Sequence, residues 1–351
     1  MNSAIVQRIA DAILYEGYIL YPYRPSSMKN RQRWNFGGLC PRSYSESERG
    51  NERWSSQTEC LVMGTGATTI GIQLRFLHLI ARQAAEFVPN GDESDYDYRN
   101  FRAVETIKIE DRLFQTWQEA LERQFHTPLS TLDCLAHKPE RISLHFPATE
   151  SMELLRDAGG RVVGAFMRTQ RELHGAIEVS TERLDDALFR IHVQVLNLTG
   201  MADTGPVKRD QAMMSSLVSS HLILTVEGGE FVSLLDPPAQ YRDAAAQCQN
   251  VGGYPVLVGE AGATDTMFFS PVILYDYPKI APESPQSLFD GTEIDEILAL
   301  RILTLTDEEK KEMRETDERT RAILECIEAH PEQLANLHGA IRSIGPAGEN
   351  E

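Results

Sequence analysis

Apolar and polar side chains alternate through much of the middle of the chain. Between residues 59 and 80, apolar side chains occupy every second position from Ile70 to Phe76, as in a strand that buries one face. The same period recurs in several short stretches separated by turn residues, which predicts an antiparallel β-sandwich. These predicted strands cover residues 104–109, 142–146, 162–169, 176–180, 189–195, 222–226, 230–235, 256–258 and 272–275.

Two pairings among these strands are predicted from their connections. Residues 222–226 and 230–235 flank Glu227-Gly228-Gly229, and paired glycines accept the positive φ of a tight hairpin turn. Residues 162–169 and 176–180 follow one another closely and are predicted to pair as well. Both pairs favour an antiparallel arrangement.

Helical spacing marks the N-terminal part of the chain and one stretch before the predicted sandwich. Residues 3–15 place apolar side chains on one helical face, and Gly17 follows at the position of a C-cap. Phe114, Trp117, Leu121 and Phe125 recur at spacings of three, four and four, which predicts a helix over residues 113–125 with an aromatic stripe in the core.

The C-terminal part is predicted to be helical. Thr292 with Asp295 and Thr306 with Glu309 are spaced as capping boxes, so helices are expected at 294–303, 307–328 and 334–341. The second of these carries acid–base pairs four residues apart and is expected to be solvated on that face. The predicted fold class is therefore α+β. Its three expected regions are an α+β region at 1–130, the sandwich at 131–290, and packed C-terminal helices at 291–345.

Charge separates one segment from the rest of the molecule. The 351 residues carry a formal net charge of −18, which repels phosphate backbones and disfavours non-specific nucleic-acid binding. Between Gly17 and Ser45, however, there are five basic residues and no acid, so the remainder of the chain carries −23. No run of residues is apolar enough to span a membrane or to act as a signal peptide, and a cytoplasmic protein without membrane insertion is expected.

The usual signatures of cofactors and metals are missing from the sequence. The five cysteines are dispersed, and Gly64-Thr65-Gly66 lacks the third glycine and the βαβ surroundings of a dinucleotide site. Nine histidines are present, and four of them lie in or beside predicted strands, but none is closely spaced with another. No cofactor and no metal site is therefore expected. The four strand histidines are His78, His145, His192 and His221.

The segment from Tyr21 to Phe36, called here the basic-aromatic segment, is the main candidate binding surface. Arg, Tyr and Trp are enriched in interface hot spots, so docking of a protein partner is one interpretation. Packing against the protein's own acidic body, binding of a compact anion, and binding of single-stranded nucleic acid are the others. The candidate partner-binding residues are Tyr21, Tyr23, Arg24, Lys29, Arg31, Arg33, Trp34 and Phe36.

A second function class is an enzyme that acts on a small anionic substrate. Arg24, Lys29, Arg31 and Arg33 would bind the anion, and a carboxylate such as Asp276, in the proline-rich stretch 275–290, would act as the base. That stretch also fits a rigid strap over a sheet edge. The sequence contains no nucleophile elbow, phosphate loop or zinc-protease helix, and a non-catalytic protein is favoured.

Three stretches resemble a known family. They are LYEGYILYPYRPSSMKNRQRWNFG from Leu14, EFVSLLDPP from Glu230, and SPVILYDYPKIAPESPQSLFDGTEIDEILALRILTLTDEEK from Ser270. They resemble a family of bacterial proteins encoded alongside NiFe-hydrogenase and hydrogenase maturation genes. The resemblance implies an accessory or assembly protein whose partner is a hydrogenase subunit or a maturation factor, and it assigns no catalytic residue.

Overall fold

A computed structural model describes residues 2–15, 36–47, 52–88, 96–201, 207–279, 302–316 and 318–329. The described residues up to Lys279 belong to one compact unit, and those from Ile302 onward belong to a second. Among the described residues, no helix combines the length and the apolar character needed to cross a membrane.

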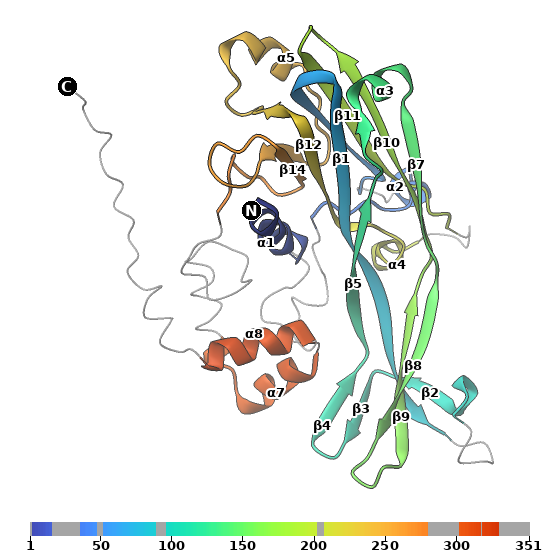
Figure 1. Cartoon of the computed structure of the whole chain (residues 1–351). Coiled ribbons are helices and arrows are strands. Elements are labelled where there is room, and N and C mark those ends of the chain that lie inside the picture. Colours follow the sequence, from blue (N-terminus) through green and yellow to red (C-terminus); the bar gives the residue numbers. More distant parts are fainter. Residues whose placement is uncertain are drawn as a thin grey trace. The chain divides into compact units, whose positions relative to one another are not determined.

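The first unit is organised by one long strand, β1 (Ser55–Phe87), which runs the length of the main sheet (Figure 1). Residues of β1 that pair with two strands at once show which strands lie on opposite edges. One edge of β1 pairs in turn with β11 (Leu188–Asn197), β6 (Ser130–Thr131), β5 (Trp117–His126) and β2 (Phe101–Val104). The other edge pairs with β12 (Val218–Val232) and then with β9 (Val162–Gln170).

The remaining strands extend this twelve-stranded sheet, and every pairing is antiparallel. Beyond β12 lie β14 (Thr266–Ser270) and β13 (Tyr254–Leu257); beyond β11 lie β10 (Leu173–Arg183) and β7 (Glu140–Phe146); β8 (Thr149–Arg156) pairs with β9. A separate two-stranded sheet joins β3 (Thr106–Ile109) and β4 (Arg112–Gln115). The predicted antiparallel, sandwich-like α+β fold is confirmed, and its main sheet takes strands from both sides of residue 130.

The core lies between the two layers of the curled sheet. The apolar faces of β1, β7, β10, β11, β12 and β14 form the largest cluster, together with α3 (Leu132–His137). The rings of Phe76 in β1 and Phe146 in β7 meet edge to face at 5.3 Å, although these strands are not hydrogen-bonded neighbours. The edge strand β7 is thereby folded back over β1, which closes the sandwich at this point.

Short helices cover parts of this body. The predicted N-terminal helix is confirmed as α1 (Asn2–Tyr15), which packs Ile9 and Ile13 beside Ile223 and Phe268. The other helical segments are α2 (Arg42–Ser45), η2 (Tyr98–Asn100), α4 (Arg209–Met213), η3 (Ala239–Tyr241) and α5 (Arg242–Ala246).

The helix predicted over residues 113–125 is wrong, because this stretch forms β4 and β5 instead. A spacing of four residues returns to the same face in a strand as well as in a helix. Trp117, Leu121 and Phe125 therefore share one face of β5, and Phe114 belongs to the preceding strand. The aromatic spacing did not distinguish the two periods.

Both predicted strand pairings are also wrong. β9 pairs with β8 and β1, which occupy both of its edges and leave none for β10. The run Glu227-Gly228-Gly229 lies inside the continuous strand β12, where Gly228 has φ +75°. The irregularity is a register shift in the ladder between β1 and β12: it lies between Gly64 and Thr69, where the Thr68 hydroxyl donates to the carbonyl oxygen of Gly228 at 2.8 Å. Residues 272–275, which were predicted as a strand, do not form one; the nearest strand, β14, ends just before them at Ser270.

The second unit contains α7 (Asp307–Thr316) and α8 (Glu318–Ala329), where one helix over 307–328 was predicted. The capping box is confirmed, since Glu309 N donates to Thr306 Oγ1 at 3.2 Å and Thr306 N donates to Glu309 Oε2 at 2.9 Å. Glu328 of α8 binds Lys310 and Arg314 of α7, so these ion pairs join two helices. Two further predicted helices, at 294–303 and 334–341, lie outside the described residues, as does the predicted capping box at Thr292. Residues 302 and 303 are the exception, since they are described and are helical.

Candidate functional site

Most of the basic-aromatic segment lies outside the described residues. This applies to seven of its candidate residues, and the eighth, Phe36, is described with its side chain 49% exposed. The seven are Tyr21, Tyr23, Arg24, Lys29, Arg31, Arg33 and Trp34. Their predicted role in binding a partner stays a prediction.

The residues on either side of this segment are held at one place on β12. The Ser219 hydroxyl donates to the carbonyl oxygen of Ile13 in α1 at 3.2 Å, and Ser220 N donates to the carbonyl oxygen of Gly37 at 3.0 Å. Gly37 has φ +57°, a conformation that glycine adopts without steric cost. Ile13 in α1 and Gly37 therefore contact adjacent residues of β12.

The return point is secured by further contacts. Leu39 forms backbone bridges with Leu217 and with Arg53, and Cys40 is fully buried beside Met213. Burial raises the pKa of the Cys40 thiol to about 11, so this cysteine remains protonated and serves the packing. The start of the described chain after the segment is thus part of the core.

A buried cation lies beneath the same region. The side chain of Arg75 is fully buried, and its Nη2 lies 2.5 Å from Asp11 Oδ1 in α1 and from Glu122 Oε1 in β5. His221 is paired directly with Arg75 across the sheet, and its Nδ1–H donates to the carbonyl oxygen of Ser219 at 2.9 Å. Burial lowers the pKa of His221 to about 3, so it stays neutral beside the cation. Arg75 connects α1, β1 and β5 rather than facing solvent.

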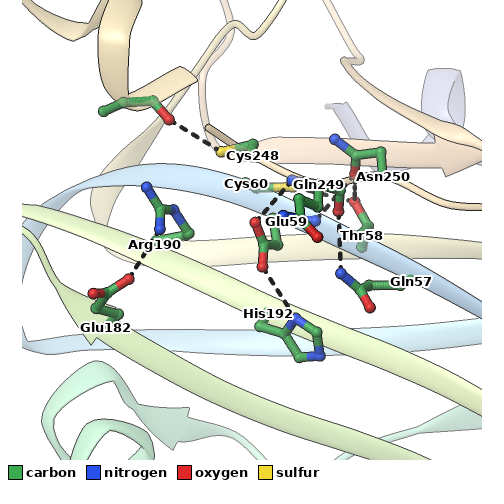
Figure 2. Close-up of polar contacts among 11 residues, drawn as sticks. Gln57, Thr58, Glu59, Cys60, Glu182, Arg190, His192, Cys248, Gln249 and Asn250 are labelled. Atoms are coloured by element: carbon green, nitrogen blue, oxygen red, sulfur yellow. Dashed lines mark hydrogen bonds and ion pairs between the residues drawn. The ribbon is translucent and has the colours of Figure 1, made fainter. Parts of the chain in front are cut away.

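A second polar cluster joins β1, β11 and the residues after α5 (Figure 2). Glu59 Oε1 lies 3.3 Å from His192 Nδ1, and its Oε2 accepts from the backbone N–H of Gln249 at 2.8 Å. The amide oxygen of Asn250 accepts from Thr58 Oγ1 at 2.8 Å and from Glu59 N at 3.0 Å. These bonds lie at Thr58 and Glu59, just before the part of β1 that pairs with β12. The cluster therefore covers a stretch of sheet edge that would otherwise be exposed.

Two cysteines lie in this cluster, and neither is prepared for nucleophilic chemistry. Burial raises the pKa of Cys60 to about 12, and it also raises the pKa of Cys248. Nearby, Arg190 Nη1 lies 3.0 Å from Glu182 Oε2 (Figure 2), and its Nη2 donates to Gln247 Oε1 at 3.2 Å. A thiol needs a lowered pKa to react as the thiolate, and both of these are shifted the other way.

Asp276, the proposed base of the enzyme alternative, is engaged in local structure. Its Oδ2 accepts from the Ser233 hydroxyl at 2.5 Å, and its Oδ1 accepts from Leu257 N at 2.8 Å. Both carboxylate oxygens thus hold residues 276–277 against β13 and the end of β12. This geometry agrees with the strap interpretation of the stretch, as far as the described residues reach.

The four strand histidines do not converge. His78 is buried and its Nε2 lies 2.8 Å from the carbonyl oxygen of Arg171, while His192 and His221 have the partners given above. His145 instead meets His174 and Glu172, two residues that sequence spacing did not suggest. The only signal that could have found this group is the register of β7 against β10, which local spacing does not contain.

Comparison with known proteins adds little to this picture. The sequence matches no protein-family model and no curated protein. One structure of the Salmonella SPI-1 type III secretion injectisome secretin InvG aligns with 8% identity and a TM-score of 0.09. The match covers 61% of this chain and 56% of that chain, so this chain spans little more than half of the secretin chain. A likeness of this size assigns neither fold nor function.

Proposed function

We propose that the protein is a non-catalytic accessory or assembly protein that docks another protein through the basic-aromatic segment. The observation that supports this most is the pair of anchors at Ser219 and Ser220, which hold the chain on both sides of the segment. A binding segment attached at both ends loses less conformational freedom on binding than a free tail does.

The composition of the segment indicates the kind of partner. Its basic residues lie within the acid-free stretch 17–45, outside which the chain carries −23, so the segment suits an acidic surface that the rest of the molecule would repel. Its tyrosines and tryptophan supply the large side chains that dominate interface hot spots. The partner surface we infer is an acidic one with apolar pockets.

The pathway rests on the resemblance of the three sequence stretches to proteins encoded with NiFe-hydrogenase genes. The partner is therefore to be sought among hydrogenase subunits and maturation factors. The described residues do not favour the alternative of an enzyme with Asp276 as its base, because the carboxylate of Asp276 already accepts hydrogen bonds from Ser233 and Leu257.

The test compares binding and stability in the same variants. Arg31→Ala, Arg33→Ala and Trp34→Ala are expected to weaken capture of purified hydrogenase subunits or maturation factors, by roughly thirtyfold at the best positions, which is about 2 kcal/mol. Their melting temperatures should equal that of the parent protein. Lys138→Ala and Tyr98→Ala, at exposed basic and aromatic positions elsewhere, should change neither quantity.

Two outcomes contradict this function. Full capture by Arg31→Ala and Trp34→Ala excludes the segment as the docking surface. A loss of binding that follows a loss of stability shows instead that the segment packs on its own acidic body.

A further inference from the structure

Two histidines face each other across the edge of the sandwich. His145 in β7 is the direct register partner of His174 in β10, and β7 is the last strand on this side of the sheet. Their imidazole rings stack nearly in parallel, with centroids 4.7 Å apart and an angle of 8° between the planes. The sheet thus presents two imidazoles side by side on its outer face.

The backbone beneath these rings is fixed. Leu144 and Leu173, which precede them in the two strands, are buried in the core, so the histidines must point outward. His174 N donates to Thr199 Oγ1 at 3.0 Å, and the carbonyl oxygen of His174 accepts from Leu198 N at 2.9 Å. The strand backbones that carry the two rings are therefore held in place before any ligand binds.

A carboxylate completes the group. Glu172 Oε1 lies 2.6 Å from His145 Nε2 and 3.2 Å from His174 Nε2. The ligand atoms of the three residues all lie within 4.8 Å of one another. Two donor atoms bound to one tetrahedral Zn²⁺ at about 2.1 Å are about 3.4 Å apart, so small side-chain movements would admit an ion between these atoms.

We propose that His145, Glu172 and His174 bind a borderline divalent transition-metal ion, with Zn²⁺ as the representative ligand. Two imidazole nitrogens and one carboxylate oxygen suit Zn²⁺ and its neighbours in the Irving–Williams order, whereas Mg²⁺ and Ca²⁺ require oxygen ligands. A neutral imidazole binds the ion through Nε2 and keeps its single ring proton on Nδ1, so the ion takes the place of the contacts between the two Nε2 atoms and Glu172. This proposal departs from the sequence-based expectation of no metal site.

The exposure of the site determines how it would be used. The three side chains are 54%, 49% and 48% exposed, so an ion reaches them from solvent without any opening of the fold. Three protein ligands leave the fourth position of a tetrahedral ion for water or for a ligand from another molecule. The site involves no residue of the basic-aromatic segment and is independent of the proposed docking function.

Calorimetric titration of the full chain with ZnCl₂, in a buffer that does not coordinate the ion, tests the proposal. One equivalent of Zn²⁺ is expected to bind, and His145→Ala and His174→Ala should each weaken this binding at least about tenfold. Glu172→Gln keeps the size of the side chain and removes its charge, so it should weaken binding as well. His137→Ala, at an exposed histidine in α3, should bind as the parent does.

A second measurement observes the histidine ligands directly. In the parent protein, Zn²⁺ should shift the imidazole NMR signals of two histidines, which the alanine variants assign to His145 and His174. The double variant His330→Ala/His338→Ala removes the two histidines outside the described residues and should retain the binding. Equal Zn²⁺ affinity in the parent and in both single alanine variants overturns the proposal, as does a parent protein that takes up no Zn²⁺.

Discussion

Ser220 donates its backbone N–H to the carbonyl oxygen of Gly37 at 3.0 Å, which holds the chain beside β12 directly after the basic-aromatic segment. Gly37 is suited to this place by its positive φ and by the space around it. A Cβ atom at this position would lie 2.5 Å from Cγ of Pro271. The contact between Gly37 and Ser220 therefore depends on the absence of a side chain.

Gly37→Ala is expected to lower the free energy of unfolding by about 2–4 kcal/mol, because the left-handed backbone and the clash with Pro271 both add cost. Urea denaturation measures this change. Gly160→Ala is the matched control, since Gly160 has φ +80° with no atom within 4 Å of an added Cβ, and it should cost only about 1–2 kcal/mol. Equal costs at the two positions would show that the contact with Pro271 is unimportant.

The buried charge of Arg75 leads to the second prediction. The double variant Asp11→Asn/Glu122→Gln removes both anions and leaves a fully buried guanidinium uncompensated, which should cost about 3–5 kcal/mol in denaturant unfolding. Glu86→Gln is the control, because its partner Arg102 is exposed and such a pair contributes about 0–1 kcal/mol. A double variant as stable as the control would mean that Arg75 is reached by water.

Stability should fall as the pH is lowered below about 6.5, and two buried histidines should account for part of the slope. Burial lowers the pKa of His78 to about 4 and that of His221 to about 3, from 6.5. Below pH 6.5 these two histidines therefore become protonated in the unfolded chain, whereas in the folded protein they stay neutral until the pH falls to about 4 or 3. Each histidine contributes up to about 1.4 kcal/mol per pH unit in this window.

The surroundings of the second nitrogen in each imidazole agree with these lowered pKa values. His78 Nδ1 and His221 Nε2 are buried without a partner, so protonation would create an N–H group that cannot donate. His78→Gln and His221→Gln should each reduce the slope of unfolding free energy against pH between 6.5 and 4.5. His137→Gln, an exposed position, should leave the slope unchanged, and an equal slope in all four proteins would contradict the assignment.

Asn197 is the subject of the fourth prediction. It is fully buried, its Nδ2 donates to the carbonyl oxygens of Leu39 and Ser215 at 2.7 and 2.9 Å, and its Oδ1 accepts from Thr199 N at 2.9 Å. Asn197→Ala leaves buried backbone groups unpaired and should cost about 2–4 kcal/mol by urea denaturation. Gln249→Ala removes an exposed amide and should change stability by no more than about 0.5 kcal/mol.

The sequence predicted elements whose burial is one-sided and local. The alternation in 142–146 and 189–195 was confirmed in β7 and β11, because each strand buries one face and exposes the other in part. The strand predicted in 59–80 was confirmed as part of β1, but its expected one-sided burial was wrong, since every residue from Leu74 to Leu79 is buried. The aromatic residues of β5 were misassigned because a four-residue spacing fits both periods. Gly228 was misassigned because positive φ occurs in a bulged ladder as well as in a hairpin turn.

The polar groups were less predictable than the strands, since their partners are distant in sequence. His145 and His174 meet through strand register, Glu59 meets residues after α5, and Arg75 meets α1. None of these pairs has a local spacing that differs from chance. The basic-aromatic segment was found from composition, and the structure adds the positions of its two flanks.

The many partners of β1 have a consequence for the way the protein is made. Thr58 in β1 donates a hydrogen bond to Asn250, which is synthesised 192 residues later. At a synthesis rate of about 5–20 residues per second, that interval lasts roughly 10–40 s, during which the strand cannot complete its pairing. Folding is therefore dominated by contacts of high sequence separation and should be slow. The nascent chain is most vulnerable to aggregation in this interval, which makes β1 the segment that a chaperone should recognise first.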